Sequence, residues 1–122
     1  MPLKTSSAKA KGRSTQQYVR DLINEIFELR EGDVESRGMG QAGVDVILSP
    51  AARDVYPFSY EVKHTKKFPT MQEIKQARYN TVEGTISGVV HQPHGARKEE
   101  TSVTFNLREF TLLWKKNGGS NG

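Results

Sequence analysis

The stretch FSYEVKHTKK, which begins at Phe58, contains the pattern on which the predicted fold depends. In an extended strand, successive side chains point to opposite faces. Phe58, Tyr60 and Val62 therefore form an apolar row on one face, and Glu61 and Lys63 lie together on the other. Such a strand is either an ordinary half-exposed strand or one side of an active site.

Periodic segments on both sides of this strand predict the rest of the fold. Apolar residues recur at helical spacing in some segments and alternate in others. The expected elements are, in chain order, a helix at residues 14–30, strands near residue 34 and at 44–50 and 58–63, a helix at 68–80, strands at 85–93 and 101–107, and a helix at 106–116. This order, αβββαββα, predicts an α/β fold in which helices flank a central mixed five-stranded sheet.

Polar residues that favour helix starts mark the beginning of each expected helix. Ser14 with Gln17 has the spacing of a capping box, as does Thr70 with Glu73. Asn106 is a favourable N-cap for the last helix.

Apolar residues at helical spacing predict the buried faces of these helices. The residues expected to be buried are Tyr18, Val19, Leu22, Ile23, Ile26, Phe27 and Leu29 in the first helix, Met71, Ile74 and Ala77 in the second, and Phe110, Leu113 and Trp114 in the third.

The composition limits the classes of protein to which the chain can belong. Its 122 residues suffice for one domain, and an apolar content of 34% predicts a small core. The absence of cysteine excludes disulfides and thiolate metal sites. No apolar run approaches the length of a membrane span, and the N-terminus lacks the apolar core of a signal peptide. We therefore expect a soluble, cytoplasmic protein.

The charge balance and the chain ends give further expectations. The net charge is +4, with 18 basic and 14 acidic residues, which mildly favours a polyanionic partner. Residues 1–13 are small, polar and basic and are expected to form a flexible arm, and residues 117–122 a flexible tail. Residues 14–116 then form a single domain.

Asp45 and Glu61 are candidate metal ligands because they belong to consecutive expected strands. Asp45 follows the glycine-rich loop RGMGQAG (residues 37–43), which permits close approach of the backbone. In an antiparallel hairpin the two carboxylates would converge at one end of the sheet. They would ligate a cation such as Mg²⁺, which keeps several waters for a substrate phosphate. Lys63 would orient the attacking water or neutralise charge on the phosphate.

The segments GVDVI (residues 43–47) and YEVKHTKK (residues 60–67) resemble the PD-(D/E)xK nuclease superfamily, and within it the archaeal-type and phage Holliday junction resolvases. The resemblance extends from KGRSTQQYVRDLI (residues 11–23) to QARYN (residues 76–80). It implies a restriction-endonuclease-like core, a Mg²⁺ or Mn²⁺ site and a homodimer. It also implies hydrolytic cleavage of branched DNA, in recombination and repair, in a prokaryotic or phage-infected cell.

The resemblance also assigns roles to individual residues. Asp45 and Glu61 match the metal ligands of the family, and Val62 would offer its backbone carbonyl to the metal. Lys63 matches the lysine of the motif. Gln76 resembles the glutamine of the helix that follows the motif in several branches.

Two positions depart from the family pattern. Val44 stands where the superfamily name has proline, a common variation. Gln16 stands where resolvases often carry a glutamate in the first helix; its amide oxygen is a possible metal ligand without the charge. Glu25, further along the same helix, is the alternative.

Basic residues near these motifs are expected to contact DNA phosphates or to form an ordinary solvated face. The candidates are Arg13, Arg37, Lys66, Lys67 and Arg78, with Ser36 in the loop region near the scissile phosphate. The histidines His64, His91 and His94 lack the spacing of a zinc site and are expected to be structural or exposed.

Two other functions are compatible with the same residues. The chain could be a restriction-like or repair nuclease that acts on linear or forked DNA. Alternatively, it could be a non-catalytic nucleic-acid-binding module in which Glu61 and Lys63 form a surface ion pair.

Overall fold

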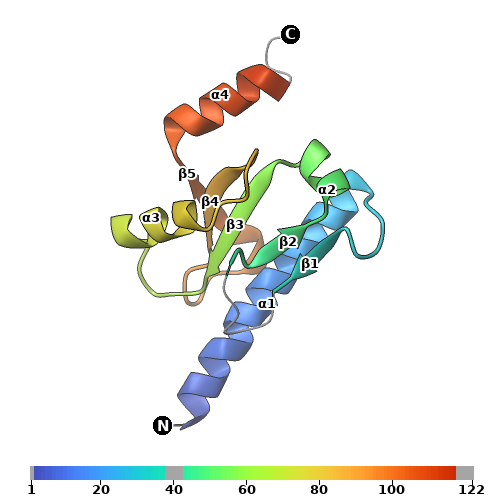
Figure 1. Ribbon diagram of the computed structural model, residues 1–122. Helices are drawn as coiled ribbons and strands as arrows, with labels where there is room; N and C mark the ends of the chain where they lie inside the picture. Colours follow the sequence, from blue (N-terminus) through green and yellow to red (C-terminus); the bar gives the residue numbers. More distant parts are fainter. Residues whose placement is uncertain (1, 38–42, 118–122) are drawn as a thin grey trace.

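The computed structural model describes residues 2–37 and 43–117 of the chain (Figure 1). The helices are α1 (Pro2–Phe27), α2 (Pro50–Val55), α3 (Met71–Tyr79) and α4 (Leu107–Asn117), with one 3₁₀ turn, η1 (Lys98–Glu100). The strands are β1 (Val34–Ser36), β2 (Val46–Leu48), β3 (Phe58–Lys63), β4 (Ile86–His91) and β5 (Ser102–Phe105). Most of the glycine-rich loop (residues 38–42) and the tail (residues 118–122) lie outside the described residues.

The five strands form one open mixed sheet in the order β1-β2-β3-β4-β5. β1, β2 and β3 pair antiparallel, β3 and β4 pair parallel across α3, and β4 and β5 pair antiparallel. The prediction of a mixed five-stranded sheet flanked by helices is confirmed.

The order of elements differs from the prediction by the short helix α2, which lies between β2 and β3. Pro50 ends β2 as expected and also occupies the start of α2, where its missing N–H costs nothing. The Ser49 hydroxyl caps this helix by accepting a hydrogen bond from the Ala52 N–H (3.1 Å). The sequence predicts no helix or strand between Ala51 and Pro57.

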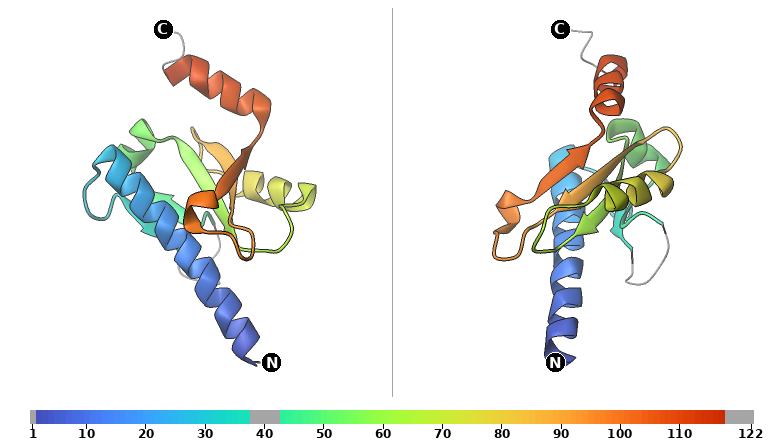
Figure 2. Two further views of the ribbon diagram at one scale, coloured as in Figure 1. Left: turned by 180° about the vertical axis from the view of Figure 1, so that it is seen from behind. Right: turned by 90° about the vertical axis from the view of Figure 1, so that its left-hand side faces the viewer.

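The two faces of β3 contact different helices. Tyr60 and Val62 join Val19 and Ile23 of α1 in the buried core, and α3 lies on the opposite side of the sheet (Figure 2). The predicted alternation of β3 is therefore confirmed. Its apolar row contacts α1, and Glu61 is on the side of α3.

α1 begins at Pro2, well before the expected start at Ser14. The intervening residues are mostly Ala, Lys and other helix-compatible types, so nothing stops the helix before the capping residue. Ser14 is therefore inside the helix, and the predicted cap is wrong. The backbone of residues 2–13, expected to be a flexible arm, is helical.

The buried face of α1 differs in part from the expected stripe. Val19 and Ile23 are buried as predicted, but Leu22 and Ile26 are 39% and 64% exposed. The helix turns the row that contains Thr15 and Val19 toward the sheet, and this row carries fewer large apolar residues. Although α1 is 26 residues long, no helix in the described part of the chain is long and apolar enough to cross a membrane.

The predicted caps of the other two helices are confirmed. Thr70 and Glu73 form a reciprocal capping box at the start of α3, and Asn106 Oδ1 accepts a hydrogen bond from the Glu109 N–H (3.0 Å). Two burial predictions are wrong, because Met71 is 66% exposed and Trp114 is 65% exposed. α4 stands away from the sheet (Figure 1), so little of its surface is covered.

Candidate active site

Asp45 lies immediately before β2 and is joined to β3 through both its backbone and its side chain. Its N–H donates to the Tyr60 carbonyl (2.9 Å), and its Oδ2 accepts a hydrogen bond from the Val62 N–H (2.7 Å). Tyr60 and Val62 are the two neighbours of Glu61 along β3. The structure therefore brings the two acids together, through the antiparallel β2–β3 pairing that the sequence led us to expect.

The pKa of Glu61 is raised from 4.5 to about 7. Burial contributes most to the increase, and the neighbouring Asp45 carboxylate adds to it. The Asn80 amide and the Lys63 ammonium act in the opposite direction. Two carboxylates that disfavour each other's charge would both be stabilised as anions by a divalent cation between them.

Lys63 lies on the same face of β3 as Glu61, but its ion pair is with α3. Its Nζ is 3.7 Å from Glu73 Oε2, and among the described residues Lys63 has no ion pair with Glu61, although its charge lowers the pKa of Glu61. Glu73 is anchored by its capping contact with Thr70, whose backbone N–H donates to the Glu73 carboxylate. This hydrogen bond is the largest of the contributions that lower the pKa of Glu73. A fixed anion therefore holds the ammonium group beside the two acids.

Asn80, at the C-terminal end of α3, is a site residue that the sequence analysis missed. Its Nδ2 donates to Glu61 Oε1 (2.9 Å). Gln76, which the resemblance favours, lies one turn earlier and is exposed. The sequence could have indicated Asn80, because Asn80 lies seven residues after Glu73. This spacing places both side chains on one face of α3.

The backbone of Val62 has the orientation that a carbonyl ligand requires. In an extended strand the N–H and C=O of one residue point to the same side. Because the Val62 N–H is directed at Asp45, the Val62 carbonyl is directed to the Asp45 side of β3.

Arg37 lies next to Asp45 and is held there by two hydrogen bonds to the backbone. Its N–H donates to the Asp45 carbonyl (2.7 Å), and its Nε donates to the Val44 carbonyl (2.5 Å). Gly43 permits this arrangement, since its φ is +104° and a Cβ there would lie 3.0 Å from Arg37 Nη2. The Arg37 side chain is therefore held against the backbone of the segment that carries Asp45.

Gln16 is a buried polar residue of α1. It is 5% exposed, and its Oε1 has no hydrogen-bond partner among the described residues. Arg20 and Asn24, one and two turns further along, line a pocket with β1. An orphaned amide oxygen is costly, and it is a ligand type that Mg²⁺ accepts.

Glu25 does not replace Gln16. It lies about two and a half turns further along α1, which places it on the opposite side of the helix, and it is exposed. Glu25 is therefore not on the buried side of α1 that carries Gln16.

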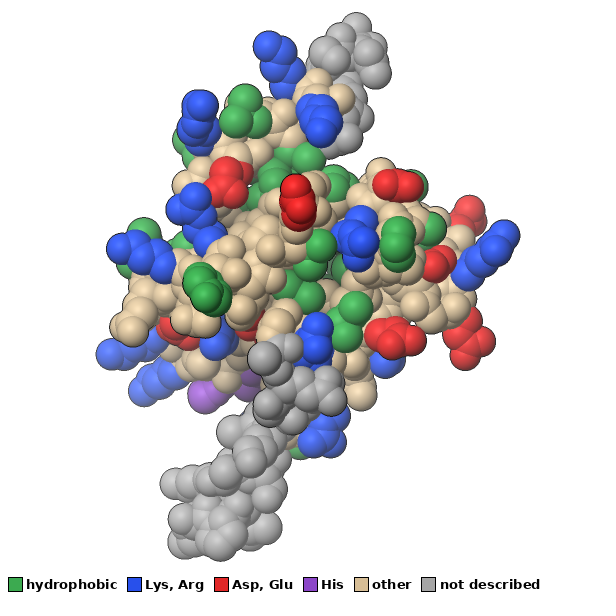
Figure 3. Space-filling model, in the orientation of Figure 1, with side chains coloured by type: hydrophobic (Ala, Val, Ile, Leu, Met, Phe, Trp, Pro, Cys, Tyr) green, Lys and Arg blue, Asp and Glu red, His purple; other side chains and the backbone are tan. Residues whose placement is uncertain are grey.

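The remaining basic candidates surround this site unevenly. Arg13, Lys66 and Lys67 are exposed. Arg78 instead pairs with Glu109 of α4 (2.8 Å), which reduces the charge it offers to a phosphate. In the view of Figure 3, Lys and Arg side chains are most frequent over α3 and α4, whereas acidic side chains gather over the C-terminal part of α1 and its surroundings.

The three histidines contact other parts of the fold or are exposed, as expected for residues without a role as metal ligands. His91 is buried, and its Nε2 is 3.0 Å from the Thr65 carbonyl. The rings of His64 and His94 are 4.9 Å apart, and His94 Nε2 is 3.1 Å from the His64 carbonyl. These contacts fix the segment that follows β3.

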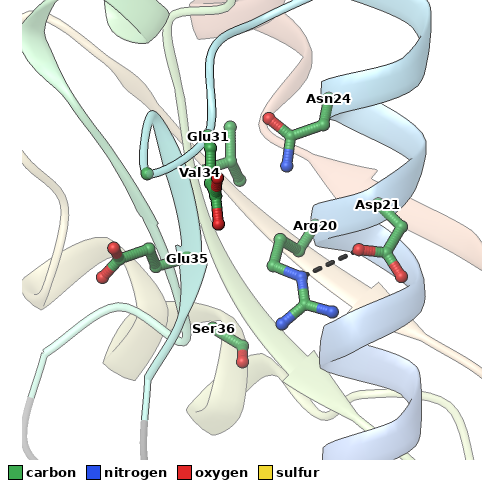
Figure 4. Close-up of a pocket in the computed structure, with 8 residues that line it drawn as sticks. Arg20, Asp21, Asn24, Glu31, Val34, Glu35 and Ser36 are labelled. Atoms are coloured by element: carbon green, nitrogen blue, oxygen red, sulfur yellow. Dashed lines mark hydrogen bonds and ion pairs between the residues drawn. The ribbon is translucent and has the colours of Figure 1, made fainter.

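A separate polar pocket of about 530 Å³ lies between α1 and β1 (Figure 4). Its lining residues are Arg20, Asp21, Asn24, Glu31, Gly32, Val34, Glu35 and Ser36. Arg20 Nε donates to Asp21 Oδ1 at 2.8 Å within this pocket. Asp45, Glu61 and Lys63 do not line it, so it is distinct from the candidate site.

A metal ion at the candidate site would depend on few protein ligands. Among residues 2–37 and 43–117, no three His, Cys, Asp or Glu side chains are close enough together to hold a metal. The donors that the structure brings together are the carboxylates of Asp45 and Glu61 and the backbone carbonyl of Val62. This oxygen-only set fits Mg²⁺, which is commonly held by one or two carboxylates and keeps several waters.

Comparison of the chain with protein-family models, with curated proteins and with solved structures found no match.

Proposed function

We propose that the chain is a Mg²⁺-dependent endodeoxyribonuclease that acts on branched DNA. The observation that carries the proposal is the placement of the Asp45 carboxylate beside Glu61, with Lys63 on the same face of β3. Two carboxylates with an ammonium group beside them suit hydrolysis of a phosphodiester with a bound divalent cation, which supports the proposal.

Each residue of the site has a chemical task in this proposal. Asp45 and Glu61 hold the cation, which when bound lowers the pKa of a coordinated water and polarises the phosphate. Lys63 orients the attacking water or neutralises charge that develops on the phosphate. Asn80 keeps the Glu61 carboxylate in position through its hydrogen bond.

Four-way junctions are the proposed substrate, and a homodimer is the proposed active form. The support is the resemblance of residues 43–47 and 60–67 to junction resolvases, together with the exposed cations Arg13, Lys66 and Lys67. Two copies related by a two-fold axis would place two sites on opposing strands of a junction. Affinity should fall steeply with salt, because phosphate contacts dominate.

A cleavage assay on three substrates tests this proposal. A four-way junction, a Y-fork and a linear duplex of the same sequence are incubated with the protein at fixed salt, with Mg²⁺ or with EDTA. We expect Mg²⁺-dependent cleavage that strongly favours the junction. Equal cleavage of all three would favour the restriction-like or repair nuclease. Binding without cleavage on any substrate would favour the non-catalytic module.

A further inference from the structure

Helix α4 contacts its own domain along only part of its surface. Phe110 packs against Phe105 of β5, with ring centroids 5.2 Å apart, and Glu109 pairs with Arg78. Leu107 and Trp114 remain 80% and 65% exposed. Large apolar side chains at such exposure indicate a surface that another structure covers.

Two exposed apolar residues of α4, Leu107 and Trp114, lie on the same side of the helix as the half-buried Phe110, with lysines beside them. Leu107, Phe110 and Trp114 have the spacing i, i+3, i+7 and therefore share a stripe along the helix. Lys115 lies directly beside Trp114, and Lys116 follows it. Both lysines are exposed, and neither forms an ion pair within the part of the chain that the structure describes. We refer to this stripe with its two lysines as the α4 face.

A groove of about 210 Å³ lies between α1 and β5, and it is apolar with acidic residues nearby, which complements the apolar and basic α4 face. Its floor and walls are mainly apolar, and Leu22 and Val103 in its lining are 39% and 38% exposed. Glu99 of η1 also lines it, as an exposed carboxylate whose Oε2 lies 4.0 Å from Arg97 Nε. Glu25 is exposed one turn beyond Leu22 on α1. We refer to this surface as the α1–β5 groove.

We propose that two copies of this chain associate by seating the α4 face of each copy in the α1–β5 groove of the other. The charges favour a second copy as the occupant, because the lysines of the α4 face meet the glutamates that border the groove. The same chain carries both surfaces, so a two-fold axis satisfies both contacts at once and closes the assembly at two copies. Asn106, where β5 ends, is the point from which α4 reaches toward the partner.

This association deepens the proposed function by naming the dimer surface, and it does not depend on cleavage. The residues involved are separate from Asp45, Glu61 and Lys63. A failure of the dimer would therefore leave the metal site untouched, and a failure of cleavage would leave the dimer untouched.

Trp114 makes the proposal directly measurable, since it is the single tryptophan of the chain. Sedimentation velocity and Trp emission are followed over about 1 to 100 µM protein, a range that brackets a micromolar dissociation constant. We expect a monomer–dimer equilibrium in which the emission shifts to longer wavelength as the dimer dissociates. An emission spectrum already blue-shifted in a monomer at every concentration would overturn the proposal, because α4 would then cover its own groove.

Substitutions identify the surfaces. Trp114→Glu should weaken dimerisation by at least about 30-fold, because a tryptophan seated in a pocket is a typical interface hot spot. Met71→Glu, which changes an exposed apolar residue at the start of α3, should leave the dimer unchanged. A dimer that survives Trp114→Glu would show that another surface is used.

Charge reversal tests the pairing of the two surfaces. Reversal of Lys115 and Lys116 to Glu should weaken the dimer about tenfold, and reversal of Glu25 and Glu99 to Lys should have a similar effect. The variant with all four reversals should regain affinity close to that of the wild type. Additive losses in that variant would contradict the proposed contact, and a partner other than a second copy would then have to cover α4.

Discussion

Asn80 donates a hydrogen bond from the end of α3 to Glu61 in β3, with 2.9 Å between Nδ2 and Oε1. α3 is the crossover helix between the parallel strands β3 and β4, so this bond links the helix end to the candidate metal ligand. This bond engages one of the two carboxylate oxygens of Glu61. A side chain that orients a metal ligand in this way affects metal affinity as well as activity.

We therefore expect Asn80→Leu to lower cleavage by about 10- to 100-fold and to raise the Mg²⁺ concentration needed for half-maximal rate. Gln76→Leu, one turn earlier in the same helix, is the matched comparison and should have a smaller effect on both quantities. The rates are measured over a Mg²⁺ titration on one DNA substrate. A larger loss for Gln76→Leu would support the family assignment of Gln76 over the geometric assignment of Asn80.

Lys63 and Glu73 form an ion pair but have unequal roles in the proposed chemistry. Lys63→Gln should lower the cleavage rate by about 10²- to 10³-fold, because it removes the charge next to the reacting phosphate. Glu73→Gln should lower it only several-fold, since glutamine can still serve in the capping box with Thr70. Equal losses in single-turnover rates would indicate that Lys63 acts only through the ion pair.

The raised pKa of Glu61 gives a pH dependence of stability in the absence of divalent metal. Between the ordinary pKa of 4.5 and the folded-state pKa of about 7, the folded protein binds more protons at Glu61 than the unfolded chain. The free energy of unfolding should therefore fall as the pH rises through this window, by about 1–2 kcal/mol after the full shift is discounted for solvent screening of the half-exposed carboxylate. Urea denaturation in EDTA at pH 5 and pH 8 measures the fall.

Two controls isolate the contribution of Glu61. Glu61→Gln should remove most of the difference between the two pH values, and saturating Mg²⁺ should reduce it in the wild type by favouring the charged form. An identical pH dependence in Glu61→Gln and in the wild type would rule out Glu61 as its source.

Gln16 offers a test of the metal site from the side of α1. Gln16→Glu adds a carboxylate at a position that is 5% exposed. Without metal this buried charge should destabilise the fold by about 1–3 kcal/mol, and Mg²⁺ should restore much of the loss while half-maximal cleavage shifts to lower Mg²⁺. If thermal unfolding shows the same loss with and without Mg²⁺, Gln16 lies out of reach of the ion.

The sequence predicted the sheet well because its strands combine alternation with apolar content. The β3 residues Tyr60 and Val62 are buried as expected, and the antiparallel pairing that brings Asp45 to Glu61 follows from two consecutive short strands. Capping residues with a clear mechanism, such as Thr70, also marked helix starts correctly.

The incorrect and missed predictions have physical causes that the spacing of apolar residues does not reveal. Ser14 has the chemistry of a cap, but no residue before it breaks the helix. Trp114 belongs to an amphipathic helix whose apolar face is only partly covered by its own domain. Asn80 acts through a tertiary contact with β3, which local sequence cannot specify.

The central claim is that Asp45 and Glu61 together hold a divalent cation that supports cleavage of DNA. The most direct measurement is the Mg²⁺-dependent cleavage rate of a four-way junction by the wild type and by Asp45→Asn, with junction binding measured in parallel by gel shift in Ca²⁺. We predict that Asp45→Asn loses cleavage by at least about 10³-fold while binding stays within a few-fold of the wild type. Cleavage by Asp45→Asn at a rate close to that of the wild type would contradict the account.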